Sequence, residues 1–112
     1  CHCDDCRRAT GSAYATNLFF KEEQVKLLQG SLKKFKHTAD SKNAMTKEFC
    51  DTCGSQIFGS GAMRPGVKNV KVGSIDDASF VKPDVNLYTS HALSCTLIDE
   101  SVDNFEAMPL AT

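Results

Sequence analysis

The chain has 112 residues, which suffices for one domain with a modest hydrophobic core. Its formal net charge is −1 with acidic and basic residues mixed along it, so it lacks the clustered basic face of nucleic-acid and anionic-membrane binders. No apolar run approaches the roughly twenty residues of a membrane span, and no secretory signal pattern is present. We therefore expect one cytoplasmic domain over residues 1–112 that binds neither nucleic acid nor membrane.

Apolar and β-favouring residues come in short runs broken by turn residues, which is typical of a mainly β protein. In chain order, the predicted strands cover residues 14–20, 25–28, 32–37, 44–49, 56–59, 70–73 and 85–88. Gly, Pro, Asn and Asp predict turns at residues 29–30, 40–43 and 64–66. Short helical turns are predicted at 21–24 and 76–80, and the acidic segment 99–106 is expected to pack over the sheet as a strap. We expect one or two antiparallel sheets that carry cysteine loops.

The six cysteines are better suited to metal binding than to disulfides. They are Cys1, Cys3, Cys6, Cys50, Cys53 and Cys95. Cysteines separated by one or two residues pair poorly with each other, because a disulfide needs a specific Cα separation and side-chain direction. The same spacing allows several thiolates to surround one ion, and thiolates favour zinc among the available divalent ions. We therefore expect reduced thiols that bind zinc (Zn2+).

A first candidate metal motif follows a predicted strand at residues 50–54. Cys50 and Cys53 are separated by two residues, and Gly54 can adopt the backbone conformation that closes such a turn. This pattern is typical of a zinc knuckle. It supplies two ligands, whereas a closed structural zinc site needs four.

The second motif places three cysteines within six residues. Cys1, Cys3 and Cys6 could hold a zinc ion with an open fourth position, which is the arrangement of catalytic zinc. Alternatively, Cys1 and Cys3 could join Cys50 and Cys53 in one closed site of four thiolates and leave Cys6 out. The spacing alone leaves both interpretations open.

Four segments in order resemble the glutathione-dependent formaldehyde-activating enzyme family, which also includes centromere protein V. They are residues 1–14 (CHCDDCRRATGSAY), 38–41 (TADS), 49–55 (FCDTCGS) and 105–109 (FEAMP). The resemblance implies an Mss4-like zinc-binding fold of antiparallel β-sheets with two metal sites. It implies that Cys1, Cys3 and Cys6 hold a catalytic zinc, and that Cys50 and Cys53 form half of a structural site.

The chain departs from this family pattern at two places. The other half of the structural site would be a Cys-x-Cys pair on a strand before Cys1, so we expect the N-terminal strand and first cysteine pair to be missing. An edge left in this way would favour strand pairing with a second copy, so a homodimer is a further prediction. Cys95 lies where similar sequences carry tryptophan, and its apolar neighbours predict a buried, inert thiol.

The resemblance implies a zinc-dependent carbon–sulfur lyase that forms or cleaves S-(hydroxymethyl)glutathione or a related thiol adduct. Arg7 and Arg8 are candidates to bind carboxylates of a glutathione-like substrate, unless they only balance thiolate charge. Ser12 is a candidate to line the pocket, and His2 is a candidate for proton transfer. His37 and His91 are expected to have ordinary surface or core roles. The competing interpretation is a non-catalytic zinc-binding module that interacts with another protein.

Overall fold

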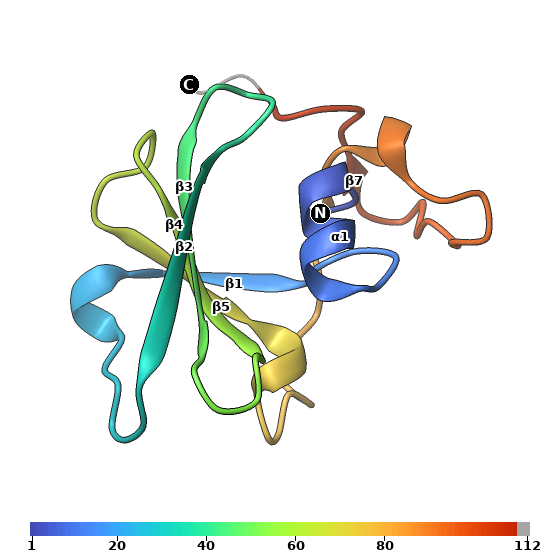
Figure 1. The fold of residues 1–112 in the computed structure, drawn as a ribbon. Helices are drawn as coiled ribbons and strands as arrows, with labels where there is room; N and C mark the ends of the chain where they lie inside the picture. The colour runs from blue at the N-terminus through green and yellow to red at the C-terminus, as the bar shows by residue number, and fades with distance from the viewer. Residues whose placement is uncertain (110–112) are drawn as a thin grey trace. The chain divides into compact units, whose positions relative to one another are not determined.

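Five antiparallel strands form the main sheet, in the spatial order β1-β5-β4-β3-β2 (Figure 1). The computed structural model describes residues 1–109; residues 110–112, which the predicted domain includes, lie outside the described residues. The strands are β1 (Asn17–Lys21), β2 (Leu32–Thr38), β3 (Ala44–Cys50), β4 (Gln56–Gly61) and β5 (Val67–Lys71). Two 3-10 turns follow β1 and β5, namely η1 (Glu22–Gln24) and η2 (Val72–Ser74). Residues 17–76 form a compact unit, here called the sheet unit.

The centre of the sheet unit combines one aromatic side chain with a buried ion pair. Phe58 on β4 is 8% exposed, and the equally buried Glu48 on β3 lies opposite it. The Glu48 carboxylate lies 3.3 Å from Nζ of Lys68, and this ammonium group also lies 5.0 Å from the centre of the Phe58 ring. A buried carboxylate needs such a partner, because the loss of water would otherwise strongly disfavour its charged form.

Among the described residues, 1–16 and 77–109 form a second compact unit, here called the helix unit. It holds α1 (Asp4–Thr10), β6 (Val85–Asn86), η3 (Thr89–His91) and β7 (Asp103–Asn104). The strands β6 and β7 pair in parallel. The Cys1 and Ala15 backbones hydrogen-bond each other (N···O 2.7 and 3.0 Å), and His2 N donates to Leu87 O. These bonds hold the segment before α1 in place.

The strand predictions succeed best in the middle of the chain. The predicted strands at 32–37, 44–49 and 56–59 correspond to β2, β3 and β4, and the predicted helical turn at 21–24 contains η1. The strands predicted at 14–20, 70–73 and 85–88 overlap β1, β5 and β6 with shifted ends. β2 lies at an edge of the sheet, and its lysines at 33, 34 and 36 are exposed. The mainly β fold is confirmed.

Two predicted elements are wrong for identifiable reasons. Residues 25–28 form no strand, because the Val25 N–H closes η1 on Glu22 O and Leu28 is 84% exposed, so the run has no buried face. Residues 76–80 form no helical turn, because the Asp77 carboxylate accepts a hydrogen bond from Ser79 N. Such local side-chain bonds compete with helix formation. The second sheet is parallel, not antiparallel, since β7 in the acidic segment runs alongside β6.

Candidate metal centre

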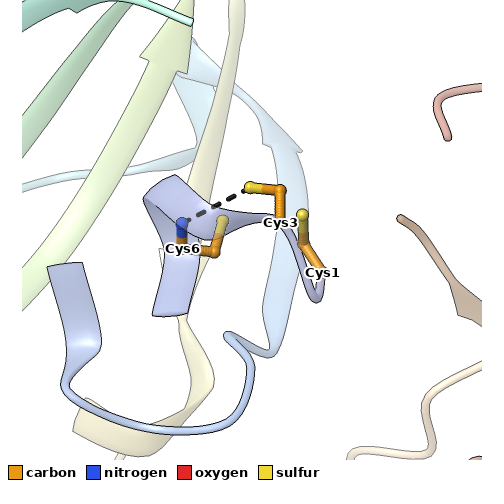
Figure 2. Close-up of side chains that lie close together, drawn as sticks. All are labelled: Cys1, Cys3 and Cys6. Carbon is orange, nitrogen blue, oxygen red and sulfur yellow. Dashed lines mark hydrogen bonds between the residues drawn. The ribbon is translucent and has the colours of Figure 1, made fainter. Parts of the chain in front are cut away.

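Three cysteine sulfurs converge at the start of α1 (Figure 2). The Sγ atoms of Cys1, Cys3 and Cys6 all lie within 4.8 Å of one another, and all three residues are half-buried. Within residues 1–109, they are the one group of three or more His, Cys, Asp or Glu side chains placed closely enough to share an ion. Thiolates bound to one zinc at 2.3 Å would lie about 3.8 Å apart in a tetrahedral site. The donor atoms and their separation therefore fit a metal ion.

The local sequence explains why these sulfurs meet. Cys3 is the N-cap residue of α1, and its sulfur accepts a hydrogen bond from Cys6 N at 3.4 Å. The helix is favoured by acidic residues in its first turn and basic residues in its last, which complement its dipole. It ends at Gly11, which adopts a left-handed conformation with φ of 64°. The sequence prediction placed residues 1–6 in a loop and missed this helix.

The environment of Cys3 favours its thiolate form. A hydrogen bond from the Cys6 thiol lowers the pKa of Cys3 from its usual 9.0 to about 5, helped by the backbone N–H groups of Cys6 and Asp5 and opposed by partial burial. Because the two thiols interact, this value describes the first proton lost by the pair. The thiolate is the form that binds metal and attacks carbon. One sulfur of the group is therefore already ionised at neutral pH.

His2 lies between two of the cysteines, but its side chain belongs to the interior of the helix unit. It is 2% exposed, and its ring centre lies 4.9 Å from that of Tyr14. Burial lowers the pKa of His2, which keeps the ring neutral. This position favours a packing role over the predicted proton transfer.

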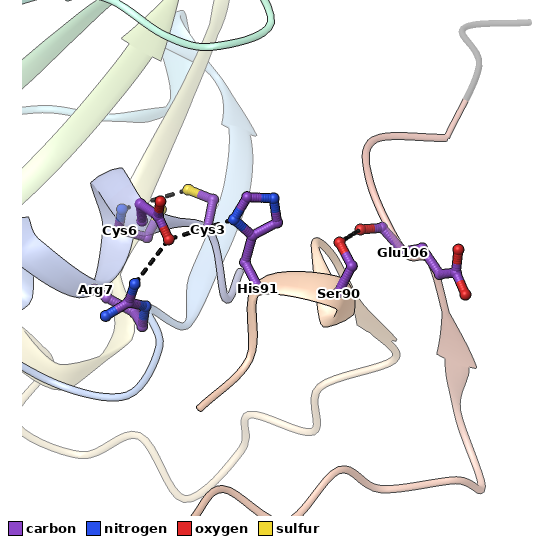
Figure 3. A network of polar contacts seen from close by, with 7 residues as sticks. Cys3, Cys6, Arg7, Ser90, His91 and Glu106 are labelled. Carbon is purple, nitrogen blue, oxygen red and sulfur yellow. Dashed lines mark hydrogen bonds and ion pairs between the residues drawn. The ribbon is translucent and has the colours of Figure 1, made fainter. Parts of the chain in front are cut away.

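Asp4 connects α1 to a distant histidine, His91. Figure 3 shows Arg7 of α1 and His91, the two side chains that Asp4 contacts. Oδ1 of Asp4 accepts a hydrogen bond from Nη2 of Arg7 at 2.7 Å and lies 3.3 Å from Nδ1 of His91. The Arg7 contact, followed by that of His91, lowers the pKa of the Asp4 carboxyl. The sequence analysis expected only an ordinary surface or core role for His91. No local signal could reveal the contact, because the two residues are 87 positions apart.

The remaining substrate-binding candidates lie on or just after α1. Arg8 is in the last turn of the helix and is exposed, whereas Arg7 is half-buried against Asp4. Ser12 is also exposed, and its backbone N–H donates to Oγ1 of Thr10. Arg8 and Ser12 are therefore accessible to a ligand, while Arg7 already binds a carboxylate of the protein.

The second cysteine motif forms a tight turn in the sheet unit. Cys50 is the last residue of β3, and its backbone accepts from Gly54 N and donates to Ser55 O. Gly54 has a φ of 78°, as the sequence predicted for the residue closing this turn. The Cys53 sulfur is exposed and lies 3.2 Å from Oγ of Ser55, whose hydrogen bond lowers the pKa of that thiol. The turn has the backbone of a knuckle with two available sulfurs.

The prediction that Cys95 is a buried thiol is wrong. It is exposed in the segment after η3, where Leu97 is 96% exposed. The apolar neighbours at 93–98 therefore do not enclose it, since an apolar run buries its members only when another element covers them.

A comparison with known protein families agrees with this arrangement. The model of the family described as glutathione-dependent formaldehyde-activating enzyme matches residues 1–91. The chain belongs to this family. The matched range includes both cysteine motifs and His91, and ends before Cys95. No curated protein matched the chain in a separate search. None of the helices within residues 1–109 has both the length and the apolar character that crossing a bilayer requires.

Proposed function

We propose that this protein is a zinc-dependent carbon–sulfur lyase that adds glutathione to formaldehyde, or cleaves the resulting S-(hydroxymethyl)glutathione or a related thiol adduct. The observation that supports this proposal is the group of three half-buried sulfurs around one point. Three protein ligands leave one position of a tetrahedral zinc site open, as in catalytic zinc centres. The family match supports the choice of substrates.

In this proposal Cys1, Cys3 and Cys6 hold the zinc ion. Their sulfurs are soft donors that favour zinc. Because the pKa of Cys3 is lowered, this cysteine is a thiolate at neutral pH, and zinc does not have to displace a proton from it. When bound, zinc would polarise an aldehyde carbonyl or hold a substrate thiol in its ionised form. The cysteines would hold the ion at the start of α1.

Arg7, Arg8 and Ser12 are the proposed substrate contacts. Glutathione carries two carboxylates, and a guanidinium group can bind a carboxylate through two parallel hydrogen bonds. Arg8 fits this role best, because it is exposed and forms no ion pair with another described residue. Arg7 would act mainly through Asp4, which it contacts at 2.7 Å.

Cys50 and Cys53 are proposed as half of a second, structural zinc site. Their turn supplies two sulfurs and leaves two ligands to come from elsewhere.

Homodimer formation also stays a prediction. Both β1 and β2 are edge strands of the five-stranded sheet, and an edge strand can pair with another chain. Light scattering after size-exclusion chromatography would test it, and a monomer at all concentrations would contradict it.

The function is tested by measuring adduct formation from glutathione and formaldehyde by exchange NMR, with and without reduced, zinc-loaded protein. The matched variants are Cys6→Ser, which removes a proposed ligand, and Cys95→Ser, which changes an exposed cysteine outside the group. We expect the parent and Cys95→Ser to exchange glutathione and formaldehyde with their adduct faster than the uncatalysed reaction does. Cys6→Ser should show no such acceleration. A parent that binds zinc without accelerating exchange would support the non-catalytic zinc module instead.

A further inference from the structure

The group formed by Cys1, Cys3 and Cys6 offers sulfur and no other donor atom to a bound ion (Figure 2). Among residues 1–109, no further His, Cys, Asp or Glu places a donor atom within 4.8 Å of all three sulfurs. The carboxylate of Asp4, which directly follows Cys3, is already bound, since its Oδ1 lies 2.7 Å from Nη2 of Arg7. The described part of the chain therefore supplies three soft ligands and no fourth.

Three sulfurs leave a zinc ion incomplete, but they satisfy a trivalent arsenic atom. Zinc takes four ligands in a tetrahedral site, so its fourth ligand has to come from water or from a substrate. Arsenic(III) forms three bonds and carries a lone pair of electrons on its remaining side, so three sulfurs complete its shell. Sulfur is also the donor that it prefers, because soft ligands select soft acceptors.

The charge balance favours the same ligand. Three thiolates bring three negative charges, of which a zinc ion compensates two and arsenic(III) compensates all three. An uncompensated charge is costly where water is partly excluded, and all three cysteines are half-buried. The neighbouring guanidinium of Arg7 is paired with Asp4 and so does not supply the missing positive charge.

The backbone holds the three sulfurs in place before any ion binds. Cys3 is the N-cap residue of α1, and its sulfur accepts a hydrogen bond from Cys6 N at 3.4 Å. Cys1 is fixed separately, because its backbone exchanges two hydrogen bonds with that of Ala15. A preorganised site binds more tightly, since less conformational freedom is lost when the ligand arrives.

We propose that the three-cysteine group binds trivalent arsenic, supplied as arsenous acid, through one arsenic–sulfur bond to each cysteine. Arsenous acid is small and uncharged in neutral solution, so it can reach half-buried sulfurs. The inference goes beyond the proposed lyase and does not depend on catalysis. Arsenic would occupy the position proposed for zinc and would therefore exclude zinc from it.

The binding reaction is a balanced exchange of ligands. Each arsenic–sulfur bond replaces one arsenic–oxygen bond, and the hydroxide that leaves takes up the thiol proton to become water. Where the thiol is already ionised, the leaving hydroxide takes its proton from solvent. One arsenous acid and three thiols thus give one arsenic bound to three sulfurs and three waters. No atom changes its oxidation state, so no oxidant or reductant is needed.

The test uses reduced, natively purified protein with arsenite as the probe. Intact mass is measured after gel filtration, and released zinc is measured with a coloured indicator. The matched variants are Cys6→Ser, which leaves two sulfurs in the group, and Cys53→Ser, which removes an exposed cysteine outside it. Thermal unfolding is followed for both variants and the parent.

We expect the parent and Cys53→Ser to gain one arsenic atom and to lose three hydrogens. Any zinc held by the three-cysteine group should be released at the same time. Cys6→Ser should bind arsenite at least roughly 10²-fold more weakly, because a further ligand on the same scaffold binds at a high effective concentration. If Cys6→Ser folds poorly, Cys3→Ser takes its place, since serine can still cap α1.

The other outcomes overturn the inference. A parent that gains no arsenic has no such site, and one that keeps a hydroxyl on arsenic and loses only two hydrogens binds it through a pair of sulfurs. Equal binding by the parent and Cys6→Ser, or loss of binding in Cys53→Ser, would place the arsenic elsewhere. Arsenite binding and lyase activity are measured separately, so a protein that binds arsenite without activity, or the reverse, overturns one proposal and leaves the other.

Discussion

The two cysteine motifs of this protein differ in how the chain surrounds their sulfurs. At residues 1–6, three half-buried sulfurs gather at a helix start, and one of them receives hydrogen bonds from a neighbouring thiol and from backbone N–H groups. At residues 50–53, two sulfurs lie on a tight turn at the end of a strand, and the Cys53 sulfur is exposed beside a serine hydroxyl. Both environments favour thiolates, but only the first collects enough of them to hold an ion without help. Similar spacing in sequence therefore does not imply similar sites.

We expect the two cysteine motifs to differ most in how tightly they retain zinc. Removing a residue that only hydrogen-bonds a metal ligand weakens metal binding by roughly 10–100-fold. Because Cys6 would be a direct ligand, we expect Cys6→Ser to weaken zinc binding at the first motif by more than this. Zinc per chain after dialysis against a graded chelator measures this, with Cys53→Ser as the comparison in the second motif. Unchanged zinc in Cys6→Ser would contradict the assignment of Cys6 as a ligand.

The second expected difference concerns reactivity with pH. In metal-free folded protein we expect alkylation of Cys3 by iodoacetamide to reach half its maximal rate near pH 5, because the hydrogen bond from Cys6 lowers the pKa of Cys3 to about that value. Peptide mass spectrometry after short labelling at graded pH identifies the site. The urea-unfolded protein, in which the midpoint should return to the usual pKa of 9.0, is the control. A midpoint that stays near this usual value in the folded protein contradicts the assigned environment.

The same lowered pKa affects folding of the metal-free protein. Between about pH 5 and the usual pKa of 9.0, the unfolded chain binds more protons at Cys3 than the folded chain does. The contribution of Cys3 to the free energy of unfolding should therefore rise with pH across this window and be lost as pH falls through about 5. Urea unfolding at several pH values measures it, and Cys3→Ser should show a weaker dependence over the same window.

A smaller effect is expected at the turn of the second motif. Gly54 has a φ of 78° and open space where a Cβ would lie, so Gly54→Ala adds backbone strain without a steric clash. We expect it to lower the free energy of unfolding by about 1–2 kcal/mol, measured in urea. Gly73→Ala is the matched control, because Gly73 also has open space but no positive φ. Equal stability of the two variants would contradict a role for the left-handed turn.

The smallest effect is expected from Ser55→Ala. The Ser55 hydroxyl contributes most to lowering the pKa of Cys53, so its removal should move the alkylation midpoint of Cys53 to higher pH. The shift should be smaller than the one that separates Cys3 from an ordinary thiol, because Cys53 is exposed and solvent screens the contact. An unchanged midpoint would show that the Ser55 hydroxyl does not lower the pKa of Cys53.

The middle of the sheet and the metal motifs were predictable because their signals are local. β2, β3 and β4 follow runs of β-favouring residues bounded by turn residues, and the left-handed Gly54 follows from a Cys-x-x-Cys-Gly turn. The convergence of Cys1, Cys3 and Cys6 was one of two alternatives that the spacing left open, and the structure places these three sulfurs together. Helix α1 was missed because seven residues are too few for a periodic pattern, and its signals are the caps and the charges at its ends.

The sequence by itself thus determined the mainly β class and the family, and it offered Cys1, Cys3 and Cys6 as one of two possible ligand sets, because each of these inferences depends on residue types at short spacing. Tertiary structure alone decided that His91 meets Asp4, that β6 and β7 pair in parallel, and that Cys95 is exposed. These features depend on which distant segments cover or contact one another. Such contacts follow from the path of the whole chain and leave no pattern in the residues next to them.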